Sequence, residues 1–186
     1  MNIFNSIITC DNCDLCLNQK PLIQESNTAD IFWVGLSAVK TSDKKDIPLS
    51  NSTNSGKLIG LIENIIPDKS FHKTNLVKCL PLKNEKIRYP TTKEMKKCFF
   101  NLEKEIDYLK PGFIFLLGKQ VASFILKCYD IKDYSLNNEF VYDYFNINNS
   151  KVIPIHHPSF ILIYKRKKLQ QYTDGIKAVI NGNGSK

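Results

Sequence analysis

The sequence predicts an α/β protein, a three-layer sandwich in which helices flank a central four-stranded parallel sheet. Short apolar runs at 31–35, 113–117 and 152–155 are typical of buried parallel strands. A fourth strand is expected to end within 74–82, where the chain enters a loop that contains a proline. Segments with helical spacing of apolar residues separate these strands, and this alternation favours parallel pairing with helices on both faces.

The first part of the chain follows this alternation. Residues 2–10 carry isoleucine and phenylalanine at the spacing of one helical face. A long polar loop is expected at 36–53, and loops of this length are often functional in compact domains. The next helix is expected to take Asn54 or Ser55 as its N-cap and to end at Pro67.

The second part contains one strong helix signal and two weakly patterned segments. Thr91 and Glu94 form the capping-box signature of a helix that ends before Pro111. The basic segment 83–89 is expected to be a loop. Residues 129–150 are rich in tyrosine and asparagine, and we expect an irregular or hairpin insert there.

Length and charge restrict the class of protein. The 186 residues suit a single domain, expected at 1–180, with 181–186 as a flexible tail. The net charge of +8 favours an anionic partner, such as nucleic acid or a membrane surface. The start of the chain lacks the pattern of a signal peptide, and no apolar segment approaches the ~20 residues that span a bilayer. We expect a cytoplasmic monomer without a membrane-spanning segment.

Cysteines form the first candidate site. Cys10, Cys13 and Cys16 make two overlapping C-x2-C pairs, a spacing that lets two thiolates converge on one metal. Cys79 follows a strand, and Cys98 lies in the first turns of a helix. All-thiolate ligation suits zinc or an iron–sulfur cluster. The alternative is that Cys79 and Cys98 are small buried apolar residues.

Polar residues at strand ends form the second candidate site. Asn75 and His157 are both expected at carboxyl ends of strands, which share one edge of a parallel sheet and often carry ligand-binding groups. His157 stands beside the hydroxyl of Ser159 and ahead of the basic run 165–168, which makes contact with phosphate plausible. The alternatives are a structural histidine and a solvated charged surface.

Several short motifs occur in a fixed order along about residues 13–165. They are the C-x2-C knuckle, Val34-Gly35, the N-x-x-K-C-x-P element from Asn75 to Pro81, the segment from Pro90 to Cys98, Leu116-Leu117-Gly118 and His157-Pro158-Ser159. In this order they resemble the family 4 type of uracil-DNA glycosylases, which carry a [4Fe–4S] cluster.

The resemblance implies roles for particular residues. The cluster ligands are matched by Cys13, Cys16, Cys79 and Cys98, with zinc as the less suitable occupant and with Cys10 and Cys128 left over. Asn75 matches the residue that reads the edge of the base. His157 matches the residue that stabilises negative charge on the departing base.

Two family motifs are altered in this chain. After the first strand the family has G-E-x-P-G, whose acid positions or activates water, whereas this chain has Gly35-Leu36-Ser37. The family then has P-F-V-G, whose aromatic ring stacks on the base, whereas this chain has Leu49. Gly35, Leu36 and Leu49 are therefore expected to form a rebuilt pocket wall. Ser37 or Asp43 is expected to hold the water.

The expected function is hydrolysis of the N-glycosidic bond of a flipped-out uracil or modified base in DNA. Ser159, Lys165, Arg166 and Lys167 are expected to contact phosphates, and residues 160–163 to enter the gap in the duplex. Two other functions remain open. One is a DNA-binding module of the same fold that has lost catalysis, and the other is a zinc-binding scaffold without a nucleic-acid role.

Overall fold

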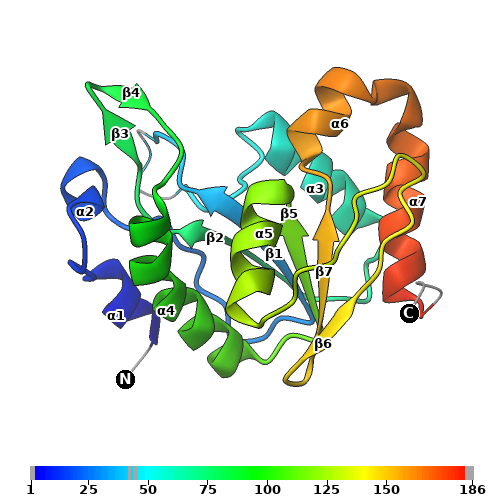
Figure 1. Cartoon of the computed structure of the whole chain (residues 1–186), viewed down its shortest axis with the longest axis horizontal. Helices are drawn as coiled ribbons and strands as arrows, with labels where there is room; N and C mark the ends of the chain where they lie inside the picture. The colour runs from blue at the N-terminus through cyan, green and yellow to red at the C-terminus, as the bar shows by residue number, and fades with distance from the viewer. Residues whose placement is uncertain (1–2, 42, 44–45, 183–186) are drawn as a thin grey trace.

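A five-stranded sheet forms the centre of the protein. The computed structural model describes residues 3–41, 43 and 46–182. The sheet has the strand order β2-β1-β5-β7-β6. The parallel strands are β1 (Ile31–Ser37), β2 (Phe71–Val77), β5 (Phe113–Leu117) and β7 (Ser150–Ile155). Because these strands are parallel, their carboxyl ends share one edge of the sheet (Figure 1).

The predicted four parallel strands are confirmed, and a fifth, antiparallel strand extends the sheet. This strand, β6 (Phe145–Ile147), lies in the segment expected to be irregular or a hairpin, and it pairs with β7 through Phe145 opposite Val152. It has three residues, too few to show a periodic pattern in the sequence.

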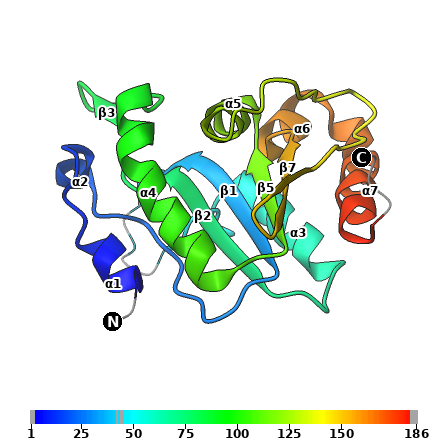
Figure 2. The same ribbon diagram turned by 60° about the horizontal axis from the view of Figure 1, so that its bottom comes forward.

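Helices cover both faces of the sheet (Figure 2). Phe32 and Val34 belong to the apolar cluster shared with α4 (Thr92–Leu109) and α5 (Lys119–Cys128), while Ile31 and Trp33 belong to the opposite cluster. The opposite face carries α3 (Asn54–Asn64), α6 (Pro158–Tyr164) and α7 (Leu169–Ile180). At the N-terminal side, α1 (Ile3–Ile8) packs on α4, and α2 (Leu15–Asn18) contains Cys16. These layers confirm the predicted sandwich.

Helix ends show where local sequence signals were sufficient. The capping box of α4 is confirmed, because the Thr91 hydroxyl accepts the Glu94 N–H and the Glu94 carboxylate accepts the Thr91 N–H at 2.7 Å. The prediction of Asn54 or Ser55 as the N-cap of α3 was wrong. Thr53 is the cap, and its hydroxyl accepts the Gly56 N–H at 3.0 Å.

The segment expected to be a basic loop contains a hairpin. Strand β3 (Leu82–Lys83) pairs antiparallel with β4 (Lys86–Ile87). The two residues between them, Asn84 and Glu85, have φ of 49° and 63°, the left-handed backbone of a tight two-residue turn. Sequence reasoning missed this hairpin because neither turn residue is glycine.

The basic run and the expected tail follow α6. A short 3-10 helix, η1 (Arg166–Lys168), separates α6 from α7. Of the expected tail, Asn181 and Gly182 follow α7, and 183–186 lie outside the described residues. Among the helices described here, none has the length and apolar character needed to cross a membrane.

Candidate active site

A cavity of about 800 Å³ opens at the carboxyl ends of the parallel strands. Parallel α/β sheets place ligands at this edge. Seven of the residues proposed from the sequence line it: Gly35, Leu36, Ser37, Leu49, Asn75, His157 and Ser159. Residues from β1, β2 and the start of α6 are therefore brought together, although 124 positions separate the first from the last.

Asn75 reaches the cavity from β2 and is held against β1. Its side chain is buried. A Cβ atom at Gly35 would lie 2.3 Å from the Asn75 Oδ1 atom, so a larger residue at Gly35 would displace the amide. The Gly35 backbone thus leaves room for a group that both donates and accepts hydrogen bonds.

His157 is the N-cap of α6, and its ring has one defined hydrogen-bonding role. Its Nδ1 atom accepts the Ser159 N–H at 3.2 Å and lies 2.7 Å from the Ser159 Oγ atom. Because Nδ1 accepts, the proton of a neutral ring sits on Nε2. Burial lowers the pKa of His157, which favours this neutral form. Gly118, at φ 94°, gives the ring room, since its Cβ would lie 3.1 Å from that of His157.

A second, smaller pocket is lined by five of the six cysteines. They are Cys10, Cys13, Cys16, Cys79 and Cys98. Burial, together with the neighbouring Cys98 and Cys13, raises the pKa of the Cys79 thiol to about 12. In the arrangement of side chains seen here, the described residues include no group of three or more His, Cys, Asp or Glu side chains placed to bind one metal ion. The all-thiol donor set nevertheless suits a thiolate-ligated group.

Comparison with known proteins identifies the family. The family model of the uracil DNA glycosylase superfamily matches residues 23–179. The chain belongs to this superfamily. The protein named type-4 uracil-DNA glycosylase from Archaeoglobus fulgidus is 27% identical over 185 residues, covering 96% of this chain and 90% of the relative. Its namesake from Thermotoga maritima is 29% identical over 166 residues, covering 87% and 82%. The resemblance seen in the motifs is thereby confirmed.

A solved structure shares the fold. The crystal structure of wild-type SMUG2 from Pedobacter heparinus superposes with a TM-score of 0.53 at 15% identity, covering 84% of this chain and 76% of that one. At this level of identity the likeness concerns the fold alone. It agrees with the sheet of parallel strands flanked by helices (Figure 1).

Four residues proposed from the sequence for catalysis or DNA binding do not line the large cavity. Asp43 is exposed and is not among the described lining residues; its carbonyl oxygen accepts the Thr41 hydroxyl at 3.1 Å. Lys165, Arg166 and Lys167 lie between α6 and α7, outside the cavity. Among the described lining residues there is no aspartate or glutamate.

Several cavity residues were missed by sequence reasoning. Lys119 and Gln120, in the first turn of α5, line the cavity, as do Arg88 and Tyr89 beside the hairpin. Lys119 could have been found, because it follows β5 at the same edge that pointed to Asn75. Arg88 and Tyr89 could not, because the hairpin itself was not predicted.

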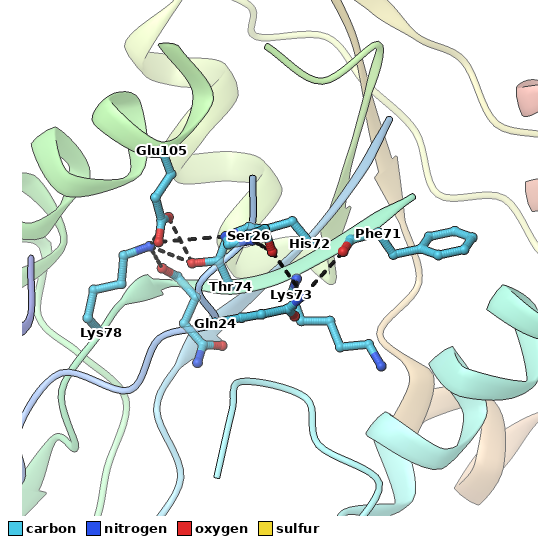
Figure 3. A network of polar contacts seen from close by, with 9 residues as sticks. Gln24, Ser26, Phe71, His72, Lys73, Thr74, Lys78 and Glu105 are labelled. Carbon is cyan, nitrogen blue, oxygen red and sulfur yellow. Dashed lines mark hydrogen bonds and ion pairs between the residues drawn. The ribbon is translucent and has the colours of Figure 1, made fainter. Parts of the chain in front are cut away.

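Lys78, which lines the cysteine pocket, forms a buried ion pair with Glu105 (Figure 3). The Lys78 ammonium donates to Glu105 Oε2 at 2.5 Å, to Thr74 Oγ1 at 2.6 Å and to the Asn75 carbonyl at 2.8 Å. Burial opposes ionisation of Glu105, but the nearby Lys78 and His72 outweigh it and lower the pKa of this carboxyl. The Lys78 N–H donates to Cys98 Sγ at 3.3 Å, so one residue contacts both Asn75 and the cysteine pocket.

Proposed function

We propose that this protein is a DNA glycosylase that hydrolyses the N-glycosidic bond of a flipped-out uracil or modified base. Its membership of the superfamily supports glycosylase activity. The observation that carries the proposal is that Asn75 and His157 line one cavity at the strand edge. A cavity of about 800 Å³ has ample room for a nucleobase and its sugar.

His157 would stabilise the leaving base. Cleavage of the bond leaves negative charge on the base and positive charge on the sugar, and a donor aimed at the base lowers the barrier. Because Nδ1 accepts the Ser159 N–H, the neutral ring would donate through Nε2. Loss of such a donor costs ~2.7–4 kcal/mol in comparable sites.

Asn75 would select the base. Its amide can offer one donor and one acceptor to the base edge, and a bidentate contact of this kind discriminates by ~1–3 kcal/mol. Leu49 occupies the place of the family's stacking ring and has a strained backbone φ of 52°. With Gly35 and Leu36 it gives an aliphatic wall, which favours a base other than unmodified uracil.

Water would be positioned without a carboxylate. Ser37, at the end of β1, is the lining hydroxyl nearest in sequence to the lost acid, whereas Asp43 is not among the described lining residues. A sugar with oxocarbenium character is electrophilic enough to need little activation of water. Lys119 adds a positive charge to the wall, which would favour the departing anion.

The cysteine pocket would hold a [4Fe–4S] cluster in preference to zinc. The ligands proposed from the resemblance are Cys13, Cys16, Cys79 and Cys98, and Cys10 adds a fifth thiol to the same pocket. A cluster there would tie the N-terminal segment to β2 and α4, as structural metal groups do. Cys128 is exposed and is not among the lining residues.

DNA would lie across the cavity and the start of α6. Ser159, Lys165, Arg166 and Lys167 are proposed to contact phosphates. Of the expected wedge 160–163, Ile161 is fully buried and Ile163 is exposed; Tyr164, which follows the expected wedge, is exposed as well. Ile163 and Tyr164 are thus the residues of this region that can enter a duplex.

A strand-cleavage assay tests the proposal. Oligonucleotides that carry uracil or single modified bases would be incubated with the protein, and abasic sites cleaved by alkali. We expect excision of at least one base, and Asn75→Asp should change which base is removed. The competing function, a DNA-binding module without catalysis, is favoured because no aspartate or glutamate stands among the described lining residues. Site-specific binding without excision of any base would establish it.

A further inference from the structure

The β3–β4 hairpin and the residues directly after it place two exposed apolar side chains on the rim of the cavity. Ile87 and Tyr89 both line the cavity, yet they are 60% and 71% exposed. Because so little of its surface is buried, the Tyr89 ring contributes little to the stability of the folded protein. Two such residues beside a cavity are typical of a contact surface rather than of a core.

The hairpin is held in place by the residue between them. Arg88 pairs with Glu94 of α4 through two contacts, at 2.6 and 2.8 Å. Its Nε atom donates to the Leu82 carbonyl at 3.1 Å, which fixes the first strand of the hairpin. Paired in this way, Arg88 is an anchor, and Ile87 and Tyr89 are presented on a support of fixed geometry.

A second pair of exposed residues stands across the strand ends. Figure 1 shows the hairpin and α6 on either side of the edge where β5 and β7 end. On α6, Ile163 and Tyr164 are 68% and 71% exposed, and the basic run follows them. On the hairpin, Lys83 and Lys86 face each other across the two strands. Each side of the edge thus combines an aliphatic residue, a tyrosine and cations.

We propose that the hairpin is a second DNA-binding arm, in which Tyr89 stacks on a base next to the flipped nucleotide. Lys83 and Lys86 contact the phosphates of the same strand. The proposal rests on the proposed function, because it needs a nucleotide in the cavity. Aromatic rings with neighbouring cations suit nucleic acid, since rings stack on bases and cations neutralise phosphates. The net charge of +8 is complementary to the same partner.

Binding to an unreactive duplex tests the stacking contact. The probe is a duplex with a tetrahydrofuran abasic-site analogue and 2-aminopurine, which is quenched when stacked, on one or the other side of it. We expect Tyr89→Ala to bind about 5- to 150-fold more weakly and to brighten the probe at one of the two positions. Tyr89→Phe should restore both values.

A matched control is available on α4. Phe100 is another exposed aromatic residue with a lysine beside it, since the Lys104 ammonium lies 4.5 Å from its ring centre, but it does not line the cavity. Phe100→Ala should bind like wild type. Thermal melting of each variant excludes loss of the fold.

The salt dependence of DNA binding tests the proposed phosphate contacts of Lys83 and Lys86. Replacing both Lys83 and Lys86 with Gln should reduce the slope of log affinity against log salt by about 2, one for each phosphate contact. An unchanged slope would contradict the phosphate contacts.

The outcomes separate this proposal from the enzyme proposal. Equal affinity and equal fluorescence for wild type and Tyr89→Ala would contradict the proposal of a DNA-binding arm, even if the wild type excises a base. Weaker binding by Tyr89→Ala, together with no excision by wild type, would support the arm and reject the enzyme. Failure of wild type to bind the duplex would overturn the arm.

Discussion

The two pockets share one segment of chain but differ in almost every physical property. Asn75 lies on the large cavity, which opens at the strand ends and whose described lining combines aliphatic side chains, neutral polar groups, Arg88 and Lys119. Cys79, four residues later, lies in the small pocket, where burial raises the pKa values of Cys13, Cys79 and Cys98. We expect the cavity to carry the activity and the cysteine pocket, with the Lys78–Glu105 ion pair, to carry stability.

The largest effect is expected at the cysteine pocket. Cys79→Ala should lose the bound iron, about four atoms in protein purified without oxygen, and much of the stability, because ligation is coupled to folding. Iron analysis and thermal melting measure both. Cys128→Ala, an exposed cysteine outside the pocket, should keep its iron. Comparing the iron content of Cys10→Ala with that of Cys16→Ala shows whether Cys10 or Cys16 is the fourth ligand of the cluster. Stoichiometric zinc without iron would contradict the prediction.

The second-largest effect is expected at the buried ion pair of Lys78 and Glu105. Lys78→Met should lower the free energy of unfolding by about 3–5 kcal/mol, because it leaves the Glu105 carboxylate buried without its cation. Urea denaturation measures this. Lys78→Met combined with Glu105→Leu should recover most of the loss, since neither charge is then buried. A double variant as unstable as the single one would contradict this explanation.

The pH dependence gives the same pair a second test. In the wild type the pKa of Glu105 is lowered on folding, so its contribution is present above the unfolded value near 4.5 and is lost as pH falls. In Lys78→Met, burial should raise that pKa, so the destabilisation should shrink as pH falls. Stability curves of both proteins from pH 7 to 3 check this opposite trend.

At the cavity, the main expected effect is on rate, with a smaller loss of stability because His157 is also the N-cap of α6. His157→Ala should slow excision by about 10²–10³ with nearly unchanged affinity for DNA. Because burial lowers the pKa of His157, activity should remain constant as pH falls to about 6.5 and decline only below it, where the ring protonates. Single-turnover rates across pH measure this. A rate that rises on acidification would mean that the protonated ring acts.

The smallest effect is expected at the anchor of the hairpin. The pKa of Glu94 is lowered to about 2, mainly by its hydrogen bond with Arg88, so its contribution is present above about pH 4.5 and is lost toward pH 2. Glu94→Gln should cost about 1 kcal/mol at pH 7, as a partly exposed ion pair does. Melting temperatures should converge with wild type as pH falls. A constant difference in melting temperature between Glu94→Gln and wild type at every pH would contradict this prediction.

The sequence by itself determined the layers and the edge of the sheet that holds the cavity. Apolar runs separated by helical segments predict parallel strands, and parallel strands place their carboxyl ends together, which was enough to bring Asn75 and His157 to one cavity. The capping box at Thr91 was equally predictable, because it depends on residues three positions apart.

The tertiary structure decided which side chains contact one another and which line the same pocket. It placed Cys10 with the other cysteines, enclosed Lys78 against Glu105, brought Lys119 and Tyr89 to the cavity, and left Asp43 outside the described lining. The reason is that these contacts join residues far apart in the chain. Local spacing fixes the face of a helix or strand on which a side chain lies, but the packing of one element on another fixes what that side chain meets.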